Sequence, residues 1–81
     1  MPLRAYIEQA LRLAEYEPDP ESGVVVARVP GADGFYAQGD SVEDARSALA
    51  DVIEGNVLLA LQLGLLIPQL PNVEILEQDV A

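Results

Sequence analysis

The sequence contains no cysteine, histidine, lysine, threonine or tryptophan among its 81 residues. Without cysteine the chain has no disulfide, and without histidine it lacks the side chain that most often serves as a general base. Nucleophilic catalysis needs an activated side chain, usually with such a base beside it. The serines at positions 22, 41 and 47 have structural explanations in a turn, at a helix start and on an outer helix face. We therefore expect no enzymatic activity, no catalytic residue and no cofactor.

Positive charge is also scarce. Four arginines stand against fourteen aspartates and glutamates, so the formal net charge is 4 − 14 = −10. The arginines are scattered along the chain, whereas binding to nucleic acid requires clustered cations that displace counterions from phosphates. We therefore expect no direct contact with DNA or RNA. A negative surface suits a basic protein partner, although it also serves to keep a small apolar protein in solution.

Long hydrophobic runs are absent as well. The longest run covers residues 57–67 and is interrupted by Gln62, which is well short of the roughly 20 residues that a membrane helix requires. The first ten residues lack the basic start and continuous apolar stretch of a signal peptide. The expectation is therefore a cytoplasmic protein that does not enter a membrane.

The periodicity of the apolar residues predicts a single α+β domain over residues 1–81. Ser41 is expected to cap a long helix by accepting a hydrogen bond from the Asp44 amide, and Gly64 is expected to end that helix. Its predicted core-facing residues are Val42, Ala45, Leu49, Val52, Ile53, Val57 and Ala60. The expected order, α-β-β-β-α-β, consists of a helix over residues 3–13, a short extended segment near 14–17, strands over 24–29 and 35–38, the long helix, and a short strand over 73–76.

Oligomerisation is expected because the chain has too much apolar surface for its size. A domain this small buries only about 60% of the surface of its unfolded chain, yet 51% of the residues are hydrophobic. Beyond Gly55 and Asn56 the long helix loses its polar face, and a helix that is apolar all round must be buried all round. We predict a homodimer interface formed by Val57, Leu58, Leu61 and Leu65. Gly55 indicates either close packing of another helix or a tolerated weak point.

Carboxylates are the only reactive groups present in quantity. Asp33, Asp40, Glu43 and Asp44 are close in sequence, so an enzyme that uses clustered acids or a hard cation is the catalytic alternative. Turn, cap and helix-dipole roles account for the same residues, and no calcium-loop spacing is present. We therefore expect no metal site.

Several short motifs occur in a characteristic order along the chain. The first motif is Tyr-Ile-Glu-x-Ala-Leu at residues 6–11, and the second is Ala-Glu-Tyr-Glu at residues 14–17. A valine-rich strand that ends in Pro-Gly comes next, and Gly-Asp-Ser at residues 39–41 then precedes an acidic helix start. The last motif is Gly-x-x-Ile-Pro at residues 64–68. In this order and spacing the sequence resembles the HicB family of bacterial antitoxins, in particular its short stand-alone members.

The resemblance implies a partial ribonuclease-H-like fold that binds and occludes a small basic toxin, the mRNA interferase HicA. We expect the partner surface to include Asp19, Glu21, Asp33, Asp40 and Glu43. Full-length relatives usually carry a C-terminal DNA-binding domain, and none is expected here because the sequence stops at Ala81. The alternative is an orphan homodimeric structural or interaction protein that keeps the fold and has no toxin.

Overall fold

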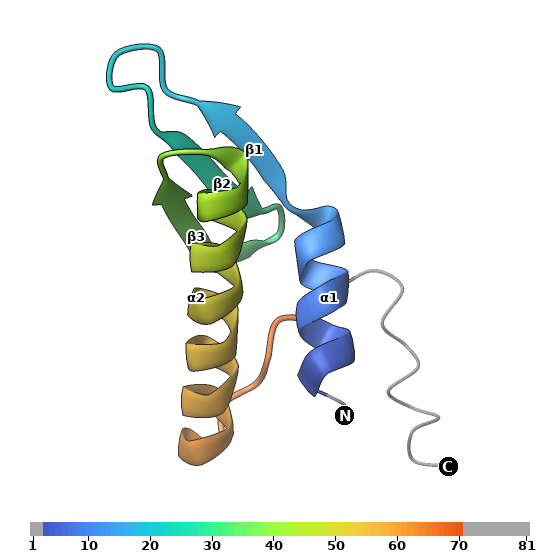
Figure 1. Cartoon of the computed structure of the whole chain (residues 1–81). Helices are drawn as coiled ribbons and strands as arrows, with labels where there is room; N and C mark the ends of the chain where they lie inside the picture. Colours follow the sequence, from blue (N-terminus) through green and yellow to red (C-terminus); the bar gives the residue numbers. More distant parts are fainter. Residues whose placement is uncertain (1–2, 71–81) are drawn as a thin grey trace.

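The computed structural model describes residues 3–70 as a helix, a three-stranded antiparallel sheet and a long helix (Figure 1). The α+β class and the order of these elements agree with the prediction. The expected strand over 73–76 lies outside the described residues. The bounds are α1 Leu3–Leu13, β1 Glu15–Pro18, β2 Val25–Val29, β3 Ala32–Gly39 and α2 Val42–Leu63.

The first helix, α1, forms because its apolar residues recur on one face. Tyr6, Ala10 and Leu11 are buried on that face, and the Tyr6 hydroxyl donates a hydrogen bond to the carbonyl of Pro68. Burial raises the pKa of Tyr6, so the hydroxyl keeps its proton and remains a donor. This bond fastens the segment after α2 to α1.

The sheet has the order β1-β2-β3, with β2 in the centre. A tight turn at Pro30 and Gly31 joins β2 to β3, and Gly31 adopts a φ of 86° that favours glycine. Val29 already pairs with Ala32. The predicted start of this strand at residue 35 was therefore too late, because residues 32–34 already lie within β3 and not in a loop.

The long helix, α2, has the predicted caps at both ends. The Ser41 hydroxyl accepts a hydrogen bond from the Asp44 amide at 3.0 Å, and Gly64 ends the helix with a left-handed φ of 70°. Of the predicted core-facing residues, Ala45, Leu49, Ile53 and Val57 are buried. Val42 is 50% exposed, because it lies in the first turn of α2, beyond the part of the helix that the core covers.

Replacing Ser41 by alanine should lower the free energy of unfolding by about 0.5–2 kcal/mol, because the Asp44 amide would lose its hydrogen-bond acceptor. Urea denaturation followed by circular dichroism would measure the loss. Ser47→Ala is the control, since Ser47 is exposed inside the same helix and alanine is the better helix former. An equal loss in both variants would contradict the capping role.

The core lies between one face of the sheet and the two helices (Figure 1). Ala27, Val29 and Phe35 point to this face and are buried. The rings of Phe35 and Tyr6 meet edge to face, with centroids 6.3 Å apart and an interplanar angle of 88°. On the opposite face Arg28 and Tyr36 are exposed, as is typical of an antiparallel sheet that packs on one side.

Candidate functional site

Four of the five acids predicted for the partner surface lie at one end of the sheet. Because Pro18 pairs with Val25, and Val25 with Gly39, the β1–β2 turn and the β3–α2 connection meet at this end (Figure 1). The turn carries Asp19 and Glu21, whereas Asp40 lies in the connection and Glu43 in the first turn of α2. We call these four residues the acidic end.

Asp33 does not belong to the acidic end. It follows the tight turn between β2 and β3, where Val29 pairs with Ala32. In an antiparallel sheet this turn lies at the opposite end of the strands from the β3–α2 connection. The prediction that Asp33 and Asp40 share one surface was wrong, because closeness in sequence placed them together while the full length of β3 separates them.

Asp19 is fixed by its own turn. Its carboxylate accepts hydrogen bonds from the Glu21 amide at 3.1 Å and from the Ser22 hydroxyl at 2.9 Å. These bonds, that from the Glu21 amide first, hold the pKa of Asp19 below its usual value. The carboxylate therefore stays charged at a lower pH than an unbonded aspartate. Its main structural task is to order the turn, and its charge remains at the surface.

Glu17 extends the acidic end and was not identified from the sequence. It is exposed on β1, opposite Val26, and lines a shallow hollow of about 260 Å³ together with Pro18, Asp19 and Pro20. The predicted extended segment near 14–17 covers this strand, and the alternation of side chains along it would have placed Glu17 on the exposed face. The signal was weak because this strand is only four residues long and ends in proline.

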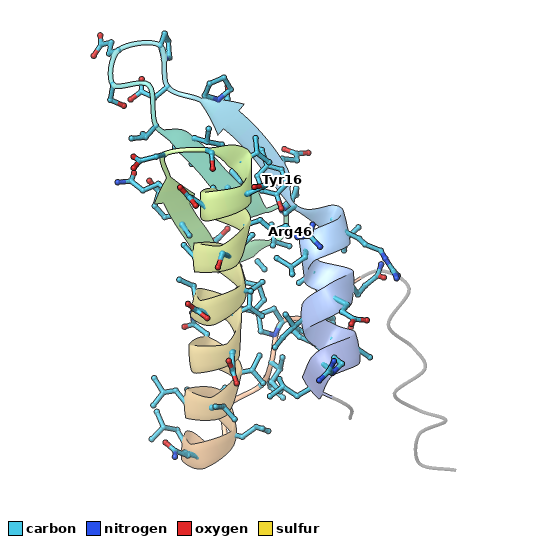
Figure 2. The ribbon with its side chains drawn as sticks, in the orientation of Figure 1. Tyr16 and Arg46 are labelled. Carbon is cyan, nitrogen blue, oxygen red and sulfur yellow. The ribbon has the colours of Figure 1, made fainter. Side chains whose placement is uncertain are left out.

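The arginines do not neutralise the acidic end. Arg28 forms an ion pair with Glu15 at 3.2 Å, in the cross-strand row nearest the other end of the sheet. Arg46 follows Glu43 by three residues and has no hydrogen bond or ion pair with any residue between 3 and 70. Figure 2 labels Arg46 on α2 and Tyr16 on β1. The buried hydroxyl of Tyr16 also has no hydrogen-bond partner within the described part of the chain. The acidic end is thus left with excess negative charge.

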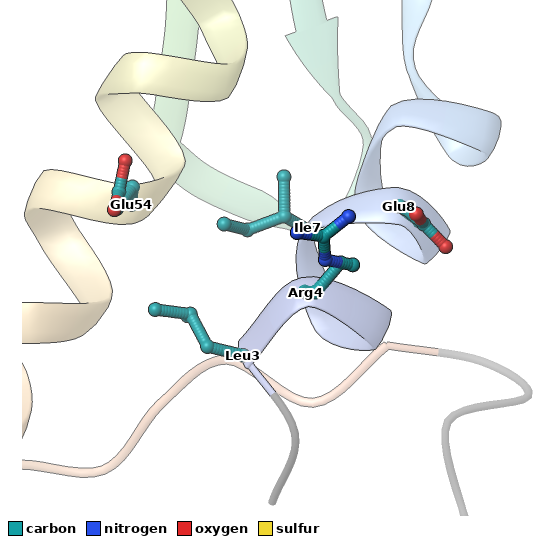
Figure 3. Close-up of a pocket in the computed structure, with 5 residues that line it drawn as sticks. All are labelled: Leu3, Arg4, Ile7, Glu8 and Glu54. Carbon is teal, nitrogen blue, oxygen red and sulfur yellow. The ribbon is translucent and has the colours of Figure 1, made fainter.

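A second hollow lies between the two helices. It measures about 280 Å³ and is lined by Leu3, Arg4, Ile7, Glu8 and Glu54. Figure 3 shows Glu54 on α2 and the other four on α1, with Leu3 and Ile7 extending toward α2. Its charged groups are the carboxylates of Glu8 and Glu54 and the guanidinium of Arg4. Within residues 3–70, no three acidic side chains converge to hold a metal ion, and no helix is long and apolar enough to cross a membrane.

Three of the four residues predicted for the dimer interface are exposed. Leu58, Leu61 and Leu65 are 44%, 57% and 59% exposed. Val57 is 1% exposed, so a partner could not reach it. Its assignment to the interface was wrong because Val57 completes the chain's own core, packed below the helix surface. The same apolar run over residues 57–67 also contains Leu59, Leu63 and Leu66, which are 51%, 61% and 96% exposed.

Comparisons with known proteins identify relatives of this arrangement. The UPF0150-like family model matches residues 5–68. The crystal structure of TTHA0281 from Thermus thermophilus is similar to this chain, with a TM-score of 0.79, 28% sequence identity and 88% of each chain covered. A search of curated proteins found no match. The helix, sheet and long helix therefore occur in the same arrangement in a solved relative.

Proposed function

We propose that this chain, which belongs to the UPF0150-like family of HicB-like proteins, is an antitoxin module that binds and occludes a small basic mRNA interferase of the HicA type. The proposal requires no catalysis, cofactor or nucleic-acid contact by the chain itself. Inhibition by occlusion needs only a surface that is complementary to the toxin. It also fits the absence of histidine, cysteine and lysine from the sequence.

The observation that carries the proposal is the acidic end. Asp19, Glu21, Asp40 and Glu43 come from two separate segments that the strand pairing brings to one end of the sheet. A basic toxin would be attracted over a distance by the net charge of −10 and held by local contacts with these carboxylates. Because the acidic side chains are largely exposed, the contacts would depend strongly on salt concentration.

The double charge reversal Glu21→Arg with Asp40→Arg tests this surface. Both positions are exposed, and neither side chain forms a hydrogen bond or ion pair with another residue of the described range 3–70, so the variant should fold normally. We expect its affinity for a purified HicA-type toxin from the source organism to fall at least about tenfold, which is about 1.4 kcal/mol. Isothermal titration calorimetry at low salt would measure the dissociation constant.

The matched control is Asp33→Arg with Glu8→Arg, which changes the net charge by the same amount away from the acidic end. Both positions are exposed. A general loss of long-range attraction would weaken both double variants equally, whereas a local contact would affect only the first. Equal affinity losses, or unchanged affinity in the Glu21 and Asp40 variant, would contradict binding through the acidic end.

A second candidate function is a homodimeric structural or interaction protein without a toxin. The exposed leucines near the end of α2, including Leu59 and Leu63, favour it, because large exposed apolar patches mark sites of association. Affinity purification from the native host with mass spectrometry would separate the two functions. A small basic protein in stoichiometric amount supports the antitoxin, and recovery of this chain alone supports the orphan dimer.

A further inference from the structure

The long helix carries a second apolar stripe beside the one that faces the core. Its members recur at intervals of four, three, four and four residues, which places them on one side of a helix of 3.6 residues per turn. The spacing is that of helices that pack side by side. The second stripe consists of Ala48, Val52, Gly55, Leu59 and Leu63.

The second stripe lies on the β3 side of α2, away from α1. Leu59 lines a hollow of about 190 Å³ together with Gly34 and Phe35 of β3. Glu54, by contrast, lines the hollow that α2 shares with α1 (Figure 3). The two flanks of α2 therefore differ in neighbours, and only one of them carries the second stripe.

The surroundings of the second stripe carry almost no charge. Residues 55–70 include no aspartate, glutamate, lysine or arginine, and neither do residues 34–39 of β3. Two exposed acids, Asp44 and Asp51, precede Ala48 and Gly55 by four residues and border the stripe. In a chain with a net charge of −10, an uncharged surface of this extent is one place where two copies can meet without bringing many carboxylates together.

The second stripe also adjoins an edge of the described sheet, because β3 is the last strand in the order β1-β2-β3. Natural edge strands are usually protected by charge, proline or a covering element. From Gly34 to Gly39, β3 carries no charge and no proline. The strand edge and the second stripe thus form one continuous uncharged face.

We propose that a second copy of this chain packs on this face, with the two α2 helices antiparallel across a twofold axis near Gly55. A twofold axis that passes between residues 55 and 56 places residue 56 + n of one copy opposite residue 55 − n of the other. Leu63 then meets the region of Ala48 in the partner copy, and Leu59 that of Val52. Large side chains on one helix therefore face small or medium ones on the other.

Gly55 provides the room for this crossing. A Cβ atom added at Gly55 would have no neighbour within 4 Å, so no residue between 3 and 70 of the same copy uses the space that the glycine leaves. Close packing at Gly55 within one copy, which the sequence left open, therefore does not occur among the described residues. Between two copies, the missing side chain lets the helix axes approach closely, since the interaxial distance depends on the side chains at the contact.

The dimer does not depend on toxin binding, and it leaves the acidic end of each copy accessible to a toxin. The acidic end lies at the N-terminal end of α2, so antiparallel helices place the two acidic ends at opposite extremes of the dimer. The like charges of the two copies are thereby kept apart, and each copy presents its own acidic end to a partner. A second copy rather than a basic protein occupies the stripe, because the stripe offers a cation no carboxylate to pair with.

The aspartate variants of neighbouring leucines test the position of the interface. Leu59 and Leu61 are similarly exposed, at 51% and 57%, but only Leu59 belongs to the second stripe. In light scattering of the full chain, the wild type and Leu61→Asp should have the mass of a dimer, and Leu59→Asp that of a folded monomer. A monomeric wild type, or a dimeric Leu59→Asp, would overturn the proposal.

Gly55→Gln separates association from folding. Glutamine is a good helix former, and its Cβ atom would have no neighbour within 4 Å among the described residues of one copy, so far-ultraviolet circular dichroism should show equal or greater helix content. The added side chain would hold two helices apart, and the mass should fall to that of a monomer. A Gly55→Gln protein that keeps the helix content and the dimer mass would exclude a helix crossing at this glycine.

Discussion

The Phe35→Ala variant should lose about 3–5 kcal/mol of unfolding free energy. Phe35 is 2% exposed and packs edge to face against Tyr6, so it connects β3 with α1 across the core. A chain of 81 residues has a total stability of about 4–12 kcal/mol. The loss is therefore a large fraction of the whole, and urea denaturation should show a variant that is mostly unfolded at low denaturant concentration.

Tyr36→Ala is the control for Phe35→Ala. Tyr36 is the next residue on the same strand but points to the open face and is 53% exposed. Its replacement should cost about 1 kcal/mol or less, mainly through lower strand propensity. Comparable losses at the two positions would mean that the aromatic ring of Phe35 is not central to the core.

The second large effect is expected for Gly39→Ala, which should lower the free energy of unfolding by about 1–3 kcal/mol. A Cβ atom at Gly39 would lie 2.5 Å from the backbone nitrogen of Ala45 and 2.7 Å from the carbonyl carbon of Asp44. These are backbone atoms of the first turns of α2, so relief requires moving β3 away from the helix. The change would also disturb the acidic end, since Asp40 follows directly.

The control for Gly39→Ala is Gly34→Ala on the same strand. A Cβ atom at Gly34 would meet nothing within 4 Å, and the backbone there does not require glycine. Alanine should be neutral or should stabilise the protein by up to about 1 kcal/mol through a less flexible unfolded chain. Thermal or urea unfolding of both variants would distinguish steric conflict from a general cost of replacing glycine in this strand.

The elements that could be predicted are those defined by local interactions. Helix α1 and the two caps of α2 follow from residues within a few positions of one another, because capping and amphipathic periodicity act over one or two turns. The strands were predicted less well. β1 is short and has weak patterning, and the pairing of Val29 with Ala32 depends on a register that only the partner strand specifies.

Strand pairing, and not composition alone, decides which acids belong to the acidic end. The abundance of acids was visible in the sequence, and four of the five predicted residues do lie together. Whether a given acid joins them depends on which end of a strand it occupies. Asp33 and Asp40 are at opposite ends of β3, and Glu17 joins the group through β1, because antiparallel pairing brings distant residues together and separates near ones.

The sequence by itself determined that this chain has no cysteine, histidine or lysine, has a charge of −10, and has 51% hydrophobic residues, because these properties depend on residue types alone. Only the tertiary structure decided that Val57 is buried while Leu59 and Leu63 are exposed. The helical pattern makes the end of α2 apolar all round, so periodicity cannot distinguish its faces. The side on which the sheet and α1 pack selects which leucines remain available to a second copy.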